Sequence, residues 1–429
     1  MPICGNVVDS LSKVWRVSIT FLLLSPLLCY ADQLELNPDR RKNQFETQEG
    51  YAIFPFPYSL PGLGSGLSLV GGMSNINNTY LDAYGLILGG DVKGAGLALD
   101  DIHLLKETLI MELGFSSISA ASVTSYNQRG MRGDKDDYTL IDITDTGSLG
   151  VRLAATFFNR RLEFYSAYYK LWFKLKSARD SKGNVIFESE NPETHSGEQK
   201  IVGFLLDLTD DYNDPRNGFR LGISGWYQEK NQSHPEHILS DINASLYLPI
   251  GKRSTWAFNL FKSDATVLSE GVTDRAAIMQ DLGTDCGVNP DPVKKAQCES
   301  LVDNTIANNK YGTATSLGGF GRLRSYSQGR YSGAHTLFFG SEFRWNVTDE
   351  FTPFDIYIIR DVRTAVQFSF FYEIGTIADL ESQLGKVTRA SAGTGLRIIT
   401  ASGAVFRADF AYGDEGFQPN IFIGYPWEI

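Results

Sequence analysis

The feature that most constrains how this sequence can fold is a two-residue alternation of apolar and polar side chains. The clearest example is TAVQFSFFYEIGT, residues 364–376, in which Phe368, Phe370 and Tyr372 share one face while Gln367 and Glu373 share the other. This period is that of a β-strand with one apolar face. Similar runs occupy residues 337–345, 404–412 and 417–427, whereas helical periodicity is scarce. The sequence therefore predicts an all-β protein.

About sixteen segments have the character of strands, many of them 11–15 residues long, whereas strands of globular proteins average roughly 5–6 residues. The predicted strands are 62–72, 79–90, 92–104, 106–119, 146–159, 161–175, 197–209, 218–230, 240–250, 254–267, 333–348, 354–362, 364–377, 386–400, 402–413 and 417–427. Segment 354–362 is the weakest of them and can instead extend its neighbour. Tight turns alternate with long polar connections, a pattern typical of outer-membrane barrels.

Two architectures produce this alternation. In a soluble sandwich the apolar face packs against a second sheet, whereas in a membrane barrel it faces lipid and the polar face lines the lumen. Mid-strand charges such as Glu342, Arg344 and Glu373 fit either architecture. Long strands, aromatic residues near strand ends and the export signal described next favour the barrel. We expect a sixteen-stranded antiparallel transmembrane β-barrel with one long loop folded into its lumen.

The N-terminus has the character of a secretory signal peptide, residues 1–31. Lys13 and Arg16 precede the short apolar run VSITFLLLSPLLCYA, which ends in a small-x-small pattern at Cys29 and Ala31. A membrane anchor is the alternative, but the run is too short to span a bilayer comfortably. Leu28 argues against a lipoprotein, because a small residue precedes the cysteine in such signals. The prediction is export through the periplasm of a Gram-negative cell to its outer membrane.

The predicted organisation after the signal is a short periplasmic tail, residues 32–61, followed by the barrel, residues 62–429. Within the barrel, residues 268–332 form the longest connection, which we expect to be a plug loop. The tail is shorter than a folded domain usually is. The whole chain carries a net charge of −11, which argues against a nucleic-acid partner because such proteins need basic patches.

Cys286 and Cys298 are the two cysteines that remain after the predicted signal peptide. In an oxidising compartment a close, isolated pair favours a disulfide that closes a loop. A Cys/His metal site is the alternative, but no histidine lies nearby in the sequence. We therefore expect a disulfide and no metal.

The stretch LGGFGRLRSYSQGRY, residues 317–331, gathers glycines and arginines in an otherwise acidic chain. Its candidate functional residues are Gly318, Gly319, Arg322, Arg324 and Tyr326. Arginine can bind a carboxylate through two parallel hydrogen bonds, and glycines permit backbone turns that other residues avoid. A solvated external loop is the alternative to a specific buried pairing.

LGGFGRLRSY resembles the tip of the inward-folded sixth loop of BamA/TamA-type barrels, the bacterial surface antigen superfamily. LDLTDDYNDPRNGFRL, residues 206–221, is similar to that family's strand-and-turn signature, and residues 391–427 resemble its last three strands. The match covers residues 197–429 well and the first half more loosely. Within the tip, Ser325 replaces the usual glycine. Two further departures stand out: the chain has no room for the POTRA domains that normally precede such a barrel, and its last strand ends Trp427-Glu428-Ile429, whereas outer-membrane barrels commonly end on an aromatic residue.

The resemblance implies that the loop arginine enters the lumen and pairs with acidic residues on the wall strands. Arg324 is the matching arginine, and Glu342 and Glu373 are the matching acids. The alternation independently places both glutamates on the polar face. Two carboxylates can share one guanidinium fork.

A closed barrel pairs its last strand with its first, and here both strands have weak sequences. The last carries Pro419 and Pro426, and the predicted first strand carries Gly71 and Gly72. A weak seam fits lateral opening toward lipid, which the resembled family is thought to use. The alternative is that these prolines lie outside the paired region.

No catalytic constellation stands out. Among the five histidines, His234 and His237 flank a proline in a loop, where a solvated loop is favoured over a zinc site. His335 in a lipase-like dyad has no support from spacing. We expect no enzyme activity and no cofactor.

The resemblance implies a role in inserting or translocating proteins or lipids through the seam. Expected partners are outer-membrane lipid and lipopolysaccharide, client proteins or lipids, and a periplasmic accessory protein. The alternative is a passive or structural barrel.

Overall fold

The computed structural model describes residues 45, 49–230, 235–281, 286–287, 292–348, 354–356, 359–362, 364–400 and 405–427. The predicted signal peptide, His234 and the last two residues lie outside these ranges. No helix among the described residues is long and apolar enough to cross a membrane.

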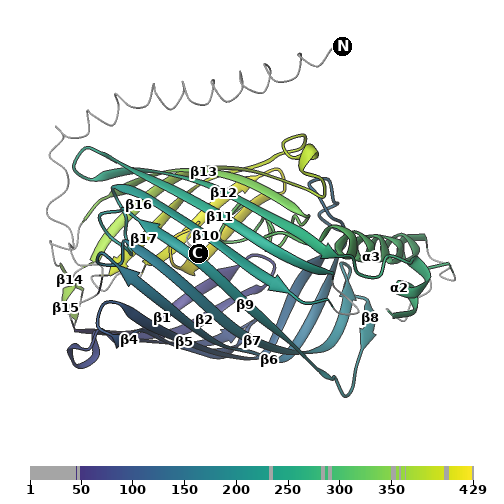
Figure 1. Cartoon of the computed structure of the whole chain (residues 1–429), viewed down its shortest axis with the longest axis horizontal. Coiled ribbons are helices and arrows are strands. Elements are labelled where there is room, and N and C mark those ends of the chain that lie inside the picture. Colours follow the sequence, from purple (N-terminus) through teal and green to yellow (C-terminus); the bar gives the residue numbers. More distant parts are fainter. Residues whose placement is uncertain are drawn as a thin grey trace, which may run out of the picture.

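The chain forms one closed antiparallel sheet (Figure 1). Its strands are β1 Gly50–Leu60, β2 Gly64–Ser74, β3 Asp82–Gly90, β4 Lys93–Leu105, β5 Leu109–Tyr126, β6 Tyr138–Phe157, β7 Leu162–Asp180, β8 Val185–Glu188, β9 Thr194–Asp207, β10 Gly218–Gln228, β11 Glu236–Ile250, β12 Ser254–Ser269, β13 His335–Asn346, β16 Thr364–Ala378, β17 Arg389–Thr400, β18 Val405–Gly413 and β19 Gly416–Ile423. Of these seventeen strands, β8 is a short return that pairs only with the end of β7. The other sixteen close the barrel, as the sequence predicts.

The barrel is polar inside and apolar outside, and this decides between the two architectures. On β16 the side chains of Gln367, Ser369 and Glu373 are fully buried, whereas Phe370 and Tyr372 are 57% and 49% exposed. A soluble sandwich would bury the aromatic face. Lipid in place of water outside the barrel explains why the aromatic side chains point outward.

The strand predicted to be the first is in fact the second strand of the barrel. The structure begins the barrel at β1, Gly50–Leu60, which lies inside the range 32–61 assigned to a tail. β1 contains Pro55 and Pro57, residues that usually argue against a strand. Conversely, segment 354–362 is not a barrel strand, because β14 (Phe354–Ile356) and β15 (Ile359–Val362) pair only with each other. The predicted list of sixteen strands therefore omits β1 and includes one segment, 354–362, that is not part of the barrel.

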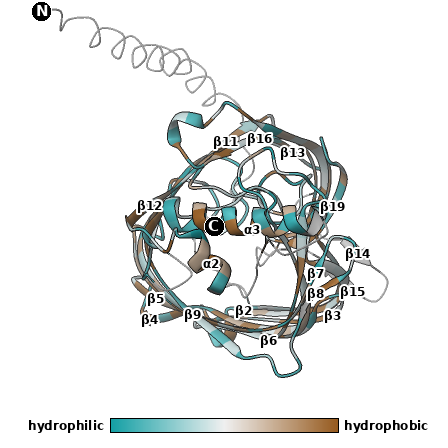
Figure 2. Ribbon diagram, turned by 90° about the vertical axis from the view of Figure 1, so that its right-hand side faces the viewer, coloured by the Kyte–Doolittle hydropathy of each residue, from teal (hydrophilic) through white to brown (hydrophobic). Residues whose placement is uncertain are grey.

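The two ends of the barrel differ. At one end, here the turn end, β1 begins and its antiparallel partner β19 finishes. β14 and β15 lie at this end (Figure 1). The other, the loop end, carries α2 (Arg275–Asp281) and α3 (Pro292–Tyr311), which lie across the ring of strands in Figure 2. A disulfide joins Cys286 to Cys298, so it ties α3 to the segment before it. Short 3-10 helices occupy Ile76–Asn78 and Glu381–Gln383.

Candidate functional site: the plug segment and the seam

Residues 317–331 form a closed loop inside the barrel, here named the plug segment. Its two ends pair as a single β-bridge, in which the amide of each of Leu317 and Tyr331 donates to the carbonyl of the other, at 3.0 and 2.9 Å. Gly318 has a φ of +104°, and a Cβ there would lie 2.3 Å from the Ser327 carbonyl oxygen. Only glycine meets both demands, so the backbone permissiveness expected at this position has a direct cause.

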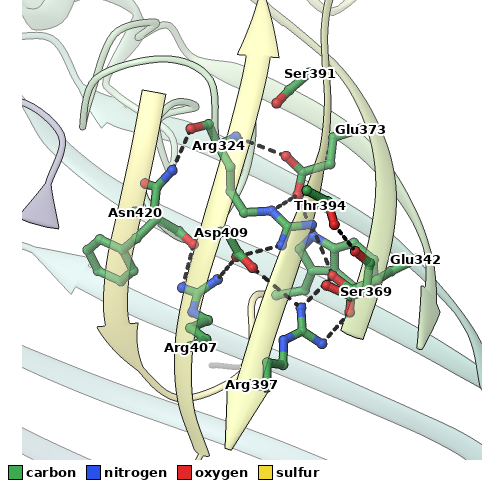
Figure 3. A network of polar contacts seen from close by, with 12 residues as sticks. Arg324, Glu342, Ser369, Glu373, Ser391, Thr394, Arg397, Arg407, Asp409 and Asn420 are labelled. Atoms are coloured by element: carbon green, nitrogen blue, oxygen red, sulfur yellow. Dashed lines mark hydrogen bonds and ion pairs between the residues drawn. The ribbon is translucent and has the colours of Figure 1, made fainter. Parts of the chain in front are cut away.

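Arg324 at the tip of the plug segment is fully buried among three carboxylates of the barrel wall (Figure 3). Its Nε lies 2.9 Å from Glu373, its Nη2 3.1 Å from Glu342 and its Nη1 2.7 Å from Asp409. Its backbone amide also donates to Glu373, at 2.9 Å, and the guanidinium carbon lies 3.4 Å from the centre of the Phe371 ring. The structure thus brings Arg324 to both glutamates expected from the sequence and adds a third acid.

Three further arginines extend this arrangement, here called the plug network. Arg397 grips Glu342 with two hydrogen bonds of 2.7 and 2.6 Å, and Arg344 donates to the same carboxylate at 2.8 Å. Arg407 donates to Asp409 at 2.9 Å. The network therefore sets four arginines against the carboxylates of residues 342, 373 and 409, an excess of one positive charge. Each acid accepts charge-assisted bonds from several directions, which is what a buried carboxylate requires.

The plug segment also holds the last strand. Asn420 on β19 donates to the Arg324 carbonyl at 2.8 Å, and Arg407 on β18 donates to the Phe320 carbonyl at 2.6 Å. The rings of Phe320 and Phe422 have centroids 4.5 Å apart. These contacts attach the plug segment to the final hairpin of the barrel.

At the loop end the plug segment contacts the hairpins on both sides of the barrel closure. The Gln328 amide donates to the Pro61 carbonyl in the β1–β2 turn at 2.9 Å. Arg330 donates to Glu415 in the β18–β19 turn at 2.8 Å, and Tyr326 accepts from the Asp414 amide of the same turn at 3.4 Å. The first and last hairpins are therefore bridged by one loop.

The other predicted plug residues have separate positions. Arg322 lies over the Phe261 ring at 3.6 Å, outside the plug network. Burial lowers the pKa of its guanidinium, and the charges of Asp241 and Glu373 offset part of the shift. Tyr326 is buried and donates to the Ala390 carbonyl at 3.2 Å.

The side chain of Ser325, which replaces the glycine of the resembled motif, fits into space left by a glycine on the barrel wall. Its amide donates to Ser391 at 3.0 Å, and a Cβ on Gly413 would lie 2.2 Å from the Ser325 hydroxyl oxygen. The absence of a side chain at Gly413 therefore makes room for the extra hydroxyl.

The seam between β1 and β19 is the weakest junction of the barrel. β1 and β19 are paired at a single position, Ser59 opposite Ile421, whereas β18 pairs with β19 continuously from Phe406 through Gly413. β1 pairs with β2 along its whole length. Gly71 and Gly72 lie opposite β1 on β2, so their assignment to the seam is wrong. They were assigned there because the predicted first strand was in fact the second.

Prolines explain why the seam is weak. In an antiparallel strand alternate residues turn their N–H groups to opposite sides. Because Pro55 and Pro57 keep an unbroken register with β2, their missing donors lie on the side that faces β19. The carbonyl of Pro419 on β19 accepts from the Ser59 hydroxyl at 3.4 Å, so its missing donor faces β1. Three backbone donors are thus absent from the facing sides of β1 and β19, although only Pro57 lies opposite a residue of the other strand when the register of Ser59 with Ile421 is continued.

An aromatic contact also crosses the seam. The rings of Phe54 and Phe56 on β1 lie 4.7 and 5.2 Å from the ring of Phe406 on β18. Hydrophobic contact therefore takes the place of part of the missing hydrogen-bond ladder.

At the turn end the C-terminal residues bend away from β19 into the lumen. Trp427 donates from its indole to Glu373 at 2.9 Å and accepts at its carbonyl from Asn243 at 2.7 Å. Tyr425 donates to Asp214, which lies in the turn between β9 and β10, at 2.5 Å. The chain end thus reaches the plug network, which no local sequence pattern indicates.

A scan against protein-family models matches residues 111–425 to the Omp85 superfamily domain. No curated protein matches the sequence. The solved structures it resembles include BamA from Haemophilus ducreyi lacking POTRA domains 1–3, at 13% identity and a TM-score of 0.48, covering 88% of this chain and 69% of that one. CdiB from Escherichia coli gives 10% identity and 0.48 (89% and 67% covered), and CdiB from Acinetobacter baumannii 12% and 0.43 (88% and 65%).

The family match spans well over half of the chain, and it covers the plug segment and the wall strands of the plug network. Barrels of this family lie in the outer membrane and are in general assembly and transport proteins rather than enzymes. On these grounds the chain belongs to the Omp85 superfamily.

Proposed function

We propose that this protein assists the insertion or translocation of proteins or lipids at the outer membrane, through an opening between β1 and β19. The observation that carries the proposal is the seam, with its single paired position and three prolines directed into it. An insertase needs a junction that opens at low cost, and each missing backbone hydrogen bond lowers that cost by roughly 1 kcal/mol.

Both ends of the molecule have a part in this proposal. The predicted signal peptide delivers the chain through the periplasm, and the turn end faces that compartment. Lipid and lipopolysaccharide surround the apolar wall, client proteins or lipids enter at the seam, and a periplasmic accessory protein guides them to the turn end. The plug segment, attached to both flanking hairpins, limits how far the seam opens.

The test is a reversible covalent lock. Ser59→Cys with Ile421→Cys places a disulfide across the seam at its one register position. Ala411→Cys with Gln418→Cys is the matched control, because these residues are register partners inside the continuous β18–β19 ladder. The locked seam is expected to block the insertion or translocation of proteins or lipids at the outer membrane in cells. A reductant is expected to restore it. The control pair should have no effect.

In-cell photo-crosslinking from Ile421 identifies what enters. Capture of unfolded outer-membrane proteins supports an insertase, and capture of lipid alone supports lipid transport. If the locked seam is harmless and Ile421 crosslinks only to β1, the protein is a passive or structural barrel.

A further inference from the structure

A second polar region lies in the lumen, outside the plug network. It is a cavity of about 480 Å³ lined by β3–β7, β9–β11, the β6–β7 and β9–β10 turns and Trp427, a size typical of small-molecule sites. Its lining includes four carboxylates from three neighbouring strands: Asp82 on β3, Asp100 and Asp101 on β4, and Glu112 on β5. Its aromatic lining includes Tyr84, Tyr165, Tyr169, Tyr212 and Trp226.

The backbone concentrates these acids. Asp82 and Asp100 are direct register partners, so two like charges lie opposite each other, an arrangement that costs stability. The β4–β5 ladder then jumps from Leu99↔Leu113 to Ile102↔Met111. This bulge sets both Asp100 and Asp101 against the single Glu112, and Asp101 takes a φ of +53°.

Three arginines line the cavity and do not balance these acids, because Arg220 already pairs with Asp207 at 3.0 Å. Arg160 pairs with Asp101 at 2.8 Å and with Glu112 at 3.5 Å, and Arg152 pairs with Glu112 at 2.6 Å. Both arginines also contact the buried Glu163. Asp100 has neither a hydrogen bond nor an ion pair among the residues that the structure describes.

A separate wall of the cavity supplies an independent indication that a hydrogen-bond donor binds there. Asp241 on β11 lines the cavity with a side chain only 9% exposed. Its Oδ2 accepts from Thr315 at 2.9 Å, but its Oδ1 is buried without any hydrogen-bond partner. A buried carboxylate oxygen in that state carries a desolvation cost that a bound donor would remove.

The aromatic walls indicate what kind of cation fits. Ammonium groups bind over the faces of tyrosine and tryptophan. The faces of Tyr165 and Tyr212 are already covered by Arg152 and Arg160, each at 4.2 Å. Tyr84, whose hydroxyl donates to Asp82 at 3.0 Å, and Tyr169 also line the cavity. Among the described residues no three His, Cys, Asp or Glu side chains are placed to hold a metal ion.

We propose that this cavity binds a small organic polycation, an aliphatic amine of the polyamine class. Asp100 and Asp241 accept its amino groups, and Tyr84 and Tyr169 contact its charged ends. The proposal is independent of whether the seam opens.

The experiment is calorimetric titration of the full-length protein, in lipid nanodiscs, with spermidine. We expect saturable binding that weakens at least tenfold in Asp100→Asn and in Asp241→Asn. Glu381→Gln is the matched control, because this acid pairs with Lys262 in an exposed position away from the cavity. The affinity of this variant for spermidine should be unchanged. Wild-type protein without saturable binding, or equal binding by all variants, would overturn the proposal.

A thermal measurement removes the ambiguity of misfolding. Without spermidine, Asp100→Asn is expected to melt at or above the wild-type temperature, because it removes an uncompensated charge. Spermidine should then raise the melting temperature of the wild type and not that of the variant. If magnesium ions stabilise the wild type as well as spermidine does, simple charge screening accounts for the effect and the proposal fails.

Discussion

At the scale of single residues, Arg324 shows what the plug network requires of a side chain. Its guanidinium directs three nitrogens at three different carboxylates, on β13, β16 and β18. A planar fork can do this, whereas a lysine ammonium acts as one compact charge. Glu373 depends on it most, because its other hydrogen-bond donor is the uncharged indole of Trp427.

We expect Arg324→Ala to lower the free energy of unfolding by about 3–5 kcal/mol, because it leaves the buried Glu373 carboxylate without a cationic partner. Arg324→Lys should recover only part of that loss, since one ammonium cannot reach all three acids. Urea unfolding of the barrel in lipid vesicles measures both effects. Arg275→Lys is the control, because Arg275 and its partner Asp303 are both exposed. Equal stability of the two lysine variants would contradict a specific role for the guanidinium.

At the scale of elements, the two strands at the seam have opposite relations to their neighbours. β1 is fully paired on the side of β2 and almost unpaired on the side of β19. The difference arises from Pro55 and Pro57, which share one side of the strand. The plug segment compensates by holding the β1–β2 turn and the β18–β19 turn together.

Restoring the missing donors should strengthen the seam. In Pro55→Thr with Pro57→Thr, each regained backbone hydrogen bond should contribute about 1 kcal/mol. Amide hydrogen exchange along β19 is then expected to slow. Insertion or translocation through the seam should decrease as well. Pro249→Thr on β11 is the control, because Pro249 lies in a ladder far from the seam. If exchange on β19 is unchanged, the prolines are not what weakens this junction.

At the scale of the whole molecule, the distribution of polarity is the reverse of that in a soluble protein. The same alternation runs through β13, β16 and β18, with charged residues inside and aromatic residues outside. The lumen itself is uneven in charge, with a positive excess in the plug network and a negative excess around the opposite cavity.

A charged residue on the lipid face tests this arrangement. Phe370→Arg on β16 should cost about 2–4 kcal/mol in lipid vesicles, because an arginine near the bilayer midplane loses its hydration. Leu380→Arg is the comparison, since Leu380 is similarly exposed but lies in a loop beyond the strand. Equal unfolding free energies for the two variants would show that this face of β16 does not meet lipid.

The same alternation explains how much was predictable from the sequence. Period-two parity places Glu342 and Glu373 on the inner face without knowledge of any neighbour, whereas Arg324 was foreseeable as their partner only through the resemblance to BamA/TamA-type barrels. Asp409 has the same parity, but its place beside Arg324 depends on how the strands curve into a ring. Trp427 was not foreseeable, because the chain leaves β19 and enters the lumen only through tertiary contacts. β1 was missed because proline normally marks an interruption of a strand, not its unpaired side.

The position of those prolines has a consequence for how the barrel is made. Until the ring closes, the growing sheet has two free margins, and these are β1 and β19. An exposed margin with all its amides intact is a template on which other chains can aggregate. Prolines at these margins make them poor templates, so the residues that weaken the finished seam also protect the unfinished sheet from joining the wrong chain.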